Sequence, residues 1–375
     1  MADPKAFLNI PRQEAGYRPV HERITDFSQV EQTLNSHERK LQASRCMDCG
    51  VPFCHWACPL GNKQPEFQDA LYKGKWREAY EVLAATNDFP EFTGRICPAL
   101  CEKSCVLKLS CDEPVTIREN EAAIAEAAFR EGYIVPIQPE RNGKRVAIIG
   151  AGPAGISCAY YLAEKGYKPT LFDKNKKPGG MVTYGIPSFV MEKDVVEAEV
   201  DVLREMGVDI RLGVEVGKDI TLKQLREEGY KAFYIAIGCQ GGRGVNVPGE
   251  DAEGVMKGVD LLHTVIDDES YTLSGDTVVI GGGNVAIDVS RTAVRCGSPK
   301  VTQVSLETRD IMPALPEEIE LAESEGIAFA GGWGPKEILT ENGKVTGIVF
   351  KKCTQVKNAE GRFDPKYDEN ETMTI

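Results

Sequence analysis

The stretch KRVAIIGAGPAGISCAYYLAEKG, residues 144–166, predicts the fold of the central part of the chain. A short apolar strand leads into Gly150-x-Gly152-x-x-Gly155, and a helical pattern follows. Such glycines permit a tight turn, the approach of a pyrophosphate to the N–H groups at the helix N-terminus, and close helix–strand packing. The next strand ends at Asp173, whose carboxylate can accept hydrogen bonds from ribose hydroxyls. We therefore expect an α/β fold with a dinucleotide site here.

A second unit of the same kind begins at DTVVIG, residues 276–281, and continues into GGGNVAID. The following strand, VTQVSLE, ends at Glu307. We expect one dinucleotide to be a flavin and the other a nicotinamide, because hydride transfer between stacked rings requires both. The expected contacts in the second glycine turn and helix start are Gly281, Gly283, Asn284 and Ala286.

Composition limits the classes of function. A chain of 375 residues with 42% hydrophobic residues can bury a large core in two or three domains. Its net charge of −13 disfavours a nucleic-acid surface and anionic membranes. No stretch has the roughly 18 consecutive apolar residues of a membrane span, and MADPKAFLNIPRQE lacks the apolar core of a signal peptide. We expect a cytoplasmic protein.

The region before the first glycine motif predicts helices. In FQDALYKGKWREAYEVLAA, residues 67–85, apolar residues recur at helical spacing and are expected in the core. Composition changes after the joint IVPIQPERNGK. We expect a helical domain over 1–140, the first segment of an FAD-binding domain over 141–255 and an NAD(P)-binding domain over 256–375.

Eight of the twelve cysteines fall between positions 46 and 111. The stretch CMDCGVPFCHWACP, residues 46–59, is close to the ferredoxin run, in which three cysteines serve one cluster and the fourth reaches another. A second group comprises Cys97, Cys101, Cys105 and Cys111. Thiolates are soft donors that suit iron, and a reducing cytoplasm disfavours disulfides. The spacing predicts two iron–sulfur clusters.

Two other interpretations of these cysteines remain open at this point. A zinc site normally uses two Cys-x2-Cys knuckles, of which one is present here. Inert buried thiols are the second alternative.

Further stretches add to these motifs: PGGMVTYGIPSF at 178–189, AIG at 236–238, VNVPGED at 245–251 and MPALPEE at 312–318. With them the chain resembles, over nearly its whole length, the small (β) subunit of glutamate synthase. Relatives of that family are the N-terminal half of dihydropyrimidine dehydrogenase and the flavin subunits of bifurcating ferredoxin-dependent transhydrogenases.

The resemblance implies two interleaved [4Fe-4S] clusters. The first ligand set would be Cys46, Cys49, Cys54 and Cys105, and the second Cys58, Cys97, Cys101 and a carboxylate, Glu121. A solvated helix residue is the alternative reading of Glu121, and Cys111 is then a spare thiol or replaces it. The resemblance also places FAD against Gly152, Asp173, Gly180, Met181 and the turn with Tyr184, Ile186 and Pro187, which would face the isoalloxazine ring.

The chain departs from the family in two places. NADPH-using relatives usually carry an arginine pair where this chain has Leu306 and Glu307. An acid there accepts from a ribose 2′-hydroxyl and repels a 2′-phosphate, so NADH is expected unless Arg309 compensates. The second departure is that ETMTI ends before the family's last flavin strands. We expect a missing flavin-domain segment, through truncation, completion by another chain, or an open site.

The leading hypothesis is an electron-transfer flavoprotein subunit. NADH would reduce FAD, and single electrons would leave through two clusters to a partner: a glutamate synthase large subunit, or a ferredoxin-, hydrogenase- or dehydrogenase-type module. Hydride transfer needs no acid or base, so no catalytic side chain is expected. The alternative is a non-catalytic docking and electron-relay scaffold with an incomplete flavin site.

Overall fold

The computed structural model describes residues 5–375, which divide into two compact units. Unit 1 contains the described residues up to 18 together with 29–179 and 190–237, and unit 2 contains 19–28, 180–189 and 238–375. This division differs from the expected boundaries at 140 and 255, because the helical segment and the first glycine-turn segment pack together within unit 1. Phe89 of the helical segment, for example, makes an edge-on ring contact with Tyr160, at a centroid distance of 6.1 Å.

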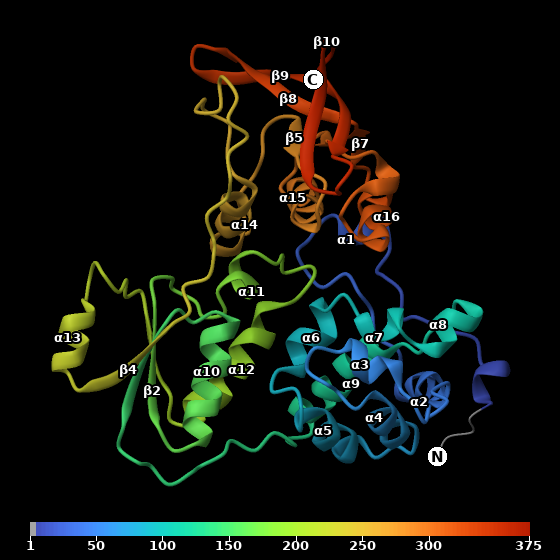
Figure 1. The fold of residues 1–375 in the computed structure, drawn as a ribbon, viewed down its shortest axis with the longest axis vertical. Coiled ribbons are helices and arrows are strands. Elements are labelled where there is room, and N and C mark those ends of the chain that lie inside the picture. The colour runs from blue at the N-terminus through green and yellow to red at the C-terminus, as the bar shows by residue number, and fades with distance from the viewer. Residues whose placement is uncertain (1–4) are drawn as a thin grey trace. The chain divides into compact units, whose positions relative to one another are not determined.

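The helical segment of unit 1 consists of short helices (Figure 1). They are η1 (Ala6–Leu8), α2 (Ser36–Ser44), α3 (Phe53–Ala57), α4 (Gln64–Tyr72), α5 (Trp76–Ala84), α6 (Pro90–Ile96), α7 (Leu100–Lys103), α8 (Val106–Cys111) and α9 (Ile117–Arg130). The helical character expected for this region is confirmed. The apolar stripe of residues 67–85 is divided between α4 and α5, because Gly74 adopts φ +73° and ends the first helix.

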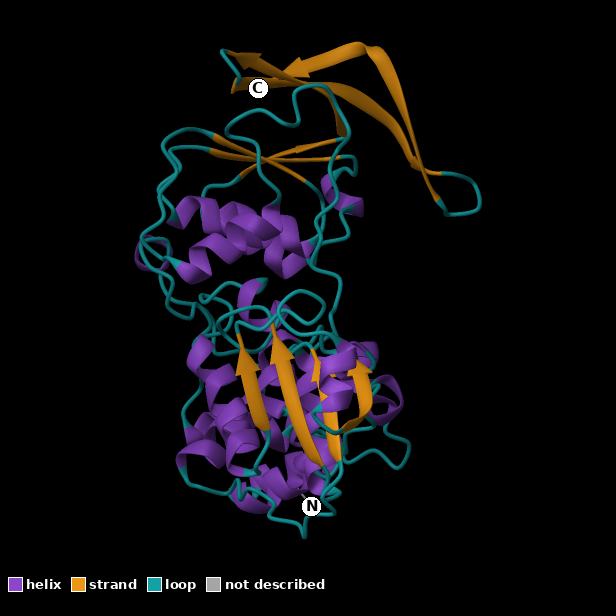
Figure 2. Ribbon diagram, turned by 90° about the vertical axis from the view of Figure 1, so that its left-hand side faces the viewer, coloured by secondary structure: helices purple, strands orange, loops and turns teal. Residues whose placement is uncertain are grey.

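The second segment of unit 1 is a parallel sheet with strand order β3-β2-β1-β4 (Figure 2). Its elements are β1 (Arg145–Ile149), α10 (Pro153–Glu164), β2 (Lys168–Asp173), α12 (Lys193–Glu205), β3 (Asp209–Leu212), α13 (Leu222–Glu227) and β4 (Tyr230–Ile235). Buried Val196, Val200 and Leu203 follow one another at helical spacing on α12, and Val200 and Leu203 join the core that includes Val146 and Ile148 of β1. The strand–turn–helix predicted from residues 144–166 is confirmed.

Unit 2 contains a second parallel sheet, β5-β6-β7, and an antiparallel sheet, β10-β9-β8. Its elements are α1 (Val20–Arg23), α11 (Met181–Tyr184), α14 (Gly258–Asp267), β5 (Thr277–Ile280), α15 (Asn284–Arg295), β6 (Val301–Ser305), η2 (Arg309–Ile311), α16 (Pro316–Ser324), β7 (Ala328–Gly331), β8 (Trp333–Glu341), β9 (Lys344–Lys357) and β10 (Phe363–Thr374). Among the described residues, no helix is long and apolar enough to cross a membrane.

A buried ion cluster attaches segment 19–28 to the rest of unit 2. The carboxylate of Glu325 accepts from Arg23 Nε at 2.9 Å, and also from Arg291 and Arg295. Burial alone would raise the pKa of Glu325, but the hydrogen bonds from Arg295 and Arg291 lower it to about 2. The ring of Phe189 lies under both of these arginines, with Arg295 Cζ 4.0 Å from its centroid. The cluster thus connects residues 19–28 and 180–189 to the remainder of unit 2, residues 238–375.

Unit 1 contains a buried carboxyl with unfavourable surroundings. Glu199 of α12 is 5% exposed. Burial, together with the negative charges of Glu91 and Asp88, raises its pKa to about 8. Glu91 differs because its carboxylate forms an ion pair with Arg95. Glu199 is therefore a source of pH-dependent instability.

We predict that Glu199→Gln stabilises the protein at neutral and alkaline pH. The folded-state pKa lies above the ordinary value, so the native state is favoured at low pH and loses stability as the pH rises from about 4.5 to about 8. The gain at pH 7 should be on the order of 3 kcal/mol and should vanish near pH 4. Thermal unfolding midpoints across this range measure it. Glu325→Gln, which weakens the buried ion pairs with Arg291 and Arg295, is the control and should destabilise; a pH-independent effect of Glu199→Gln would contradict the prediction.

Candidate functional site

The first predicted cysteine set surrounds one cavity in the helical segment. Cys46 and Cys49 lie in the loop before α3, Cys54 lies on α3, and Cys105 precedes α8. The left-handed conformation of Asp48, with φ +51°, turns the chain between the first two cysteines. Apolar side chains form most of the remaining wall: Met47, Pro52, Phe53, Pro65, Val106, Leu107, Val115 and Ile117. The structure thus brings together side chains from two segments far apart in the sequence.

The chemistry of this cavity fits an iron–sulfur cluster. Burial raises the pKa of Cys46 and of Cys54 to about 12, and the neighbouring thiols add to the rise. Such thiols ionise when a bound metal supplies positive charge. Among residues 5–375, no three His, Cys, Asp or Glu side chains converge closely enough to hold one metal ion. Four thiols spread around one cavity suit a multi-atom cluster better than a single tetrahedral zinc.

The second predicted set is also grouped. The charges of Glu121 and Cys58 act on Cys97, and those of Glu121 and Cys97 act on Cys101. Cys111 is exposed, and its Sγ lies 3.2 Å from the Leu107 carbonyl oxygen. These contacts therefore favour Glu121 over Cys111 as the fourth member of the second predicted ligand set.

Glu121 is not a solvated helix residue. It lies on α9 and is 7% exposed. Burial raises its pKa to about 7, an effect partly opposed by hydrogen bonds from Thr93 and Asn62. Asn87 also donates to its Oε1, at 3.1 Å. A carboxylate held in this way costs free energy unless it binds a cation or a proton, which is the situation expected of a metal ligand.

The first glycine turn has the close contacts that require glycine. Gly150 adopts φ +110°, and a Cβ there would lie 2.2 Å from the carbonyl oxygen of Ala236 in the AIG stretch. A Cβ on Gly155 would lie 1.9 Å from the Gly150 carbonyl oxygen. Gly152 is the N-cap of α10, so the N–H groups of that helix start directly after the turn.

Asp173 lies at the edge of this turn. Its Oδ2 accepts from Ala151 N–H at 2.7 Å and its Oδ1 accepts from Asn175 N–H at 2.8 Å. The carboxylate is 7% exposed and is fixed by backbone donors. The backbone therefore holds this acid beside the glycine turn, where the sequence predicts a ribose contact.

The predicted flavin residues are distributed between the two units. Gly150, Gly152, Gly155 and Asp173 belong to unit 1, whereas Gly180, Met181, Tyr184, Ile186 and Pro187 belong to unit 2. Tyr184 is 3% exposed, and its ring stacks on that of His263 of α14, with centroids 4.2 Å apart and planes at 10°. Sequence reasoning missed His263, because nothing in GVDLLHTVID distinguishes it from an ordinary polar helix position.

The second glycine turn is closed by the MPALPEE stretch. Asn284 Oδ1 accepts from Leu315 N–H at 2.8 Å, and Ala314 N–H donates to the Gly282 carbonyl oxygen at 3.0 Å. Gly283 is the N-cap of α15, and a Cβ on Gly281 would lie 3.1 Å from that of Ala286. This is the same strand–turn–helix arrangement as in unit 1.

Glu307 packs on this turn. A Cβ on Gly282 would lie 2.8 Å from Glu307 Oε2, so the carboxylate reaches the glycine turn although β6 ends at Ser305. Arg309 is engaged elsewhere: its Nε and Nη2 donate to the two oxygens of Glu323 at 2.6 and 2.7 Å. The acid, and not the arginine, is therefore the charged group beside the second turn.

Two family models match the chain. Residues 23–133 match the dihydropyrimidine dehydrogenase domain II, 4Fe-4S cluster family, and residues 144–362 match the pyridine nucleotide-disulphide oxidoreductase family. The fold is similar to that of Mycobacterium tuberculosis FprA in complex with NADPH, with a TM-score of 0.53 and 21% identity over 62% of this chain and 69% of that chain. This likeness concerns the fold alone.

Curated relatives are similar over most of the chain. The glutamate synthase [NADPH] small chain of Mycobacterium tuberculosis is 40% identical, over 84% of this chain and 67% of the relative. That of Bacillus subtilis is 35% identical, over 97% of this chain and 81% of the relative. The glutamate synthase [NADH] of Schizosaccharomyces pombe is 35% identical, over 96% of this chain and 18% of the relative. The chain therefore belongs to the glutamate synthase small-chain family and is an NAD(P)H-dependent flavin and iron–sulfur oxidoreductase subunit.

Proposed function

We propose that the chain takes electrons from NADH through FAD to two [4Fe-4S] clusters, and passes them to a large partner subunit. The observation that supports this most is the convergence of Cys46, Cys49, Cys54 and Cys105 on one cavity, in a chain that also has two glycine turns of the dinucleotide-binding kind. The bound groups would supply the redox chemistry: the flavin takes up a hydride and releases electrons singly, and the clusters carry single electrons.

The chain's own residues would bind and orient these groups. The free N–H groups in the first turns of α10 and α15 would bind the pyrophosphates, as in other glycine turns of this type. Asp173 and Glu307 present carboxylates beside the two turns for ribose hydroxyls. The cysteine sets and Glu121 would hold the clusters, and no side chain has to move a proton for hydride transfer.

Anaerobic reconstitution tests the proposal against the scaffold alternative. Chain loaded with iron, sulfide and FAD should lose its flavin absorbance on addition of NADH and then reduce a one-electron acceptor. A protein that binds iron and sulfide but retains no flavin, in the presence of excess FAD, would favour the scaffold.

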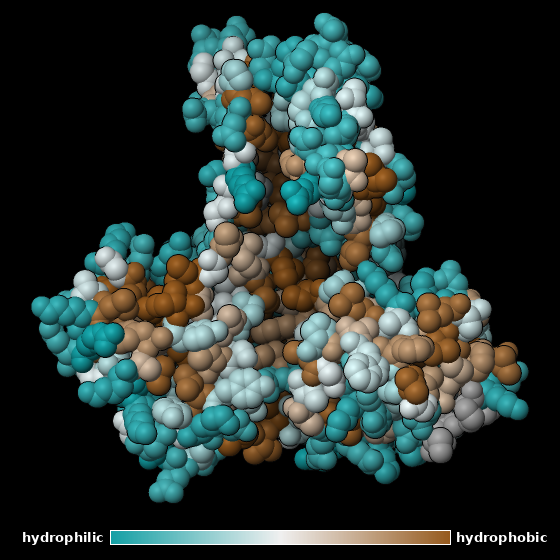
Figure 3. Space-filling model, viewed as in Figure 1, coloured by the Kyte–Doolittle hydropathy of each residue, from teal (hydrophilic) through white to brown (hydrophobic). Residues whose placement is uncertain are grey.

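The small-chain relatives point to a large subunit as partner, and the surface around the cluster ligands offers a place for it. Trp56, between Cys54 and Cys58, is 81% exposed. It belongs to an exposed apolar group that we call the Trp56 patch: Val51, Phe53, Trp56, Leu60, Leu100 and Leu109. Helices α3 and α7 of this patch are in contact, and Figure 3 shows apolar side chains gathered over α7 and α8. Exposed apolar groups of this kind mark protein interfaces, and electrons would leave here close to the ligands.

The first prediction from the proposed function concerns the cluster ligands. Cys54→Ala and Cys105→Ala should each remove the same paramagnetic signal and a similar amount of iron, because both thiols line one cavity. Cys111→Ala is the matched control and should change neither, because that thiol is exposed. Iron analysis and electron paramagnetic resonance of the reduced protein measure this. Wild-type protein that takes up zinc but no iron under anaerobic conditions would exclude the cluster assignment.

The second prediction concerns the partner. Trp56→Ser should weaken binding to the large subunit by roughly tenfold or more, because an exposed tryptophan at the centre of an interface is a typical hot spot. Phe363→Ser is the control, since Phe363 is 67% exposed on β10 and lies outside the patch. Binding is measured with the co-expressed large subunit. Equal affinities of the two variants would mean that the Trp56 patch is not the interface.

The third prediction concerns the nicotinamide. The lost hydrogen bonds and the repulsion between Glu307 and a 2′-phosphate should favour NADH by on the order of 2 to 3 kcal/mol, roughly 30- to 150-fold. Leu306→Arg with Glu307→Arg should invert the preference. Glu323→Gln is an intermediate variant: it releases Arg309 from its paired hydrogen bonds and should improve NADPH use without inversion. Flavin reduction by limiting NADH and NADPH measures this, and equal wild-type rates would show that Glu307 does not face the ribose.

A further inference from the structure

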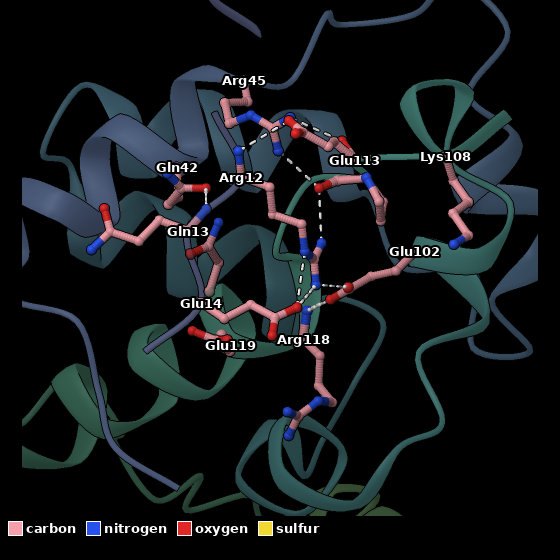
Figure 4. A network of polar contacts seen from close by, with 12 residues as sticks. Arg12, Gln13, Glu14, Gln42, Arg45, Glu102, Lys108, Glu113, Arg118 and Glu119 are labelled. Atoms are coloured by element: carbon pink, nitrogen blue, oxygen red, sulfur yellow. Dashed lines mark hydrogen bonds and ion pairs between the residues drawn. The ribbon is translucent and has the colours of Figure 1, made fainter. Parts of the chain in front are cut away.

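Arg45 carries a buried positive charge immediately before the first cysteine of the cavity. The residue is 1% exposed, although arginine is rarely buried without a strong anionic partner. Its Nε donates to the Ile10 carbonyl oxygen at 2.9 Å, and its Nη1 donates to that of Pro114 at 2.9 Å. Its Nη2 donates to the carbonyl oxygen of Glu113 at 2.9 Å and to Glu113 Oε2 at 3.0 Å (Figure 4). All donor nitrogens of the guanidinium are therefore used.

The partners of Arg45 neutralise its charge only in part. Three of the four acceptors are neutral carbonyl oxygens, and the one carboxylate belongs to Glu113, whose side chain is 47% exposed. Solvent screens that carboxylate, so it offsets little of a charge held in the interior. Neighbouring Arg12, which donates to the same Pro114 oxygen, differs because it has ion pairs with both Glu14 and Glu102. Arg45 is thus the less compensated of the two arginines.

Arg45 and the backbone that it binds adjoin residues that line the first cavity. Cys46, which follows Arg45 in the sequence, lines the cavity. Arg45 also binds the carbonyl oxygen of Pro114. The next residue, Val115, lines the cavity together with Cys105. The charges of Cys105 and Cys111 both act on the guanidinium, so the thiol of Cys105 is within electrostatic range. The dielectric of a buried site is low, and interactions between charges are stronger there than in water.

We propose that Arg45 sets the reduction potential of the cluster held by Cys46, Cys49, Cys54 and Cys105. Reduction of that cluster adds one electron, delivered along the chain of redox groups, and no proton or bond change is involved. A fixed positive charge stabilises the more negative, reduced form and so raises the potential. Arg45 therefore makes the first cluster a better electron acceptor. This inference rests on the cluster assignment of the proposed function.

Redox titration of the reconstituted chain, followed by electron paramagnetic resonance, tests the role of the charge. In Arg45→Met one of the two cluster signals should shift to lower potential, with the ratio of reduced to oxidised cluster falling on the order of tenfold at a given applied potential, which is about 59 mV for one electron. Arg45→Lys keeps the charge but not the fork of donors, and should retain most of the wild-type midpoint. Arg130→Met, which removes a solvent-exposed arginine at the end of α9, should leave this midpoint unchanged because solvent screens that charge.

The outcomes separate this inference from the cluster assignment. Wild-type chain that takes up no iron would refute the proposed clusters themselves. Full iron content with an unchanged midpoint in Arg45→Met, or an equal shift in Arg45→Lys and Arg45→Met, would overturn the inference and leave the clusters standing. If Arg45→Met loses iron, Arg45→Gln decides, because it keeps hydrogen-bond donors without the charge: its midpoint should be lower than that of the wild type, and an unchanged midpoint would overturn the role of Arg45.

Discussion

The helical segment depends on one constraint: four of its cysteine side chains pack against its hydrophobic core. Cys46, Cys54, Cys101 and Cys105 all pack against the cluster of buried residues formed by Phe67, Leu71, Leu83, Leu107 and Ile124. Helices as short as α3, α7 and α8 are marginal on their own and depend on tertiary contacts. When ligands come from segments that only folding brings together, the free energy of cluster binding is also free energy of folding.

Buried charges in this protein follow two physical patterns. Glu325 is surrounded by arginines and stays ionised, because its hydrogen bonds outweigh the cost of burial. Glu121 and Glu199 are buried where burial dominates, and both have raised pKa values. Glu121 lies beside the second cysteine set, where a metal would supply the missing charge, whereas Glu199 faces two further carboxylates. The same desolvation cost is thus compatible with ligand binding in one place and produces only instability in the other.

In unit 2, a small number of contacts determine which charge a nucleotide would meet. Gly282 leaves room for the carboxylate of Glu307 beside the turn, and the MPALPEE stretch closes over that turn through Asn284. Glu323 holds Arg309 with two parallel hydrogen bonds. The charge beside the second glycine turn therefore depends on a side chain of α16, Glu323, as well as on Glu307 after β6.

The sequence by itself determined the local units of this protein. Both glycine motifs form the predicted strand, turn and helix, because close backbone contacts at Gly150 and Gly155 leave no room for a side chain. Helical periodicity, which is also a local property of the sequence, predicted the helices of the N-terminal segment. It missed only the division of the apolar stripe of residues 67–85 into two helices at Gly74. Only the tertiary structure decided the contacts between distant residues: the burial of Glu121, the stack of Tyr184 on His263 and the bonds of Arg45 to Pro114. These contacts depend on how whole segments pack, and no pattern of neighbouring residues specifies the side chain that will fill a particular buried position.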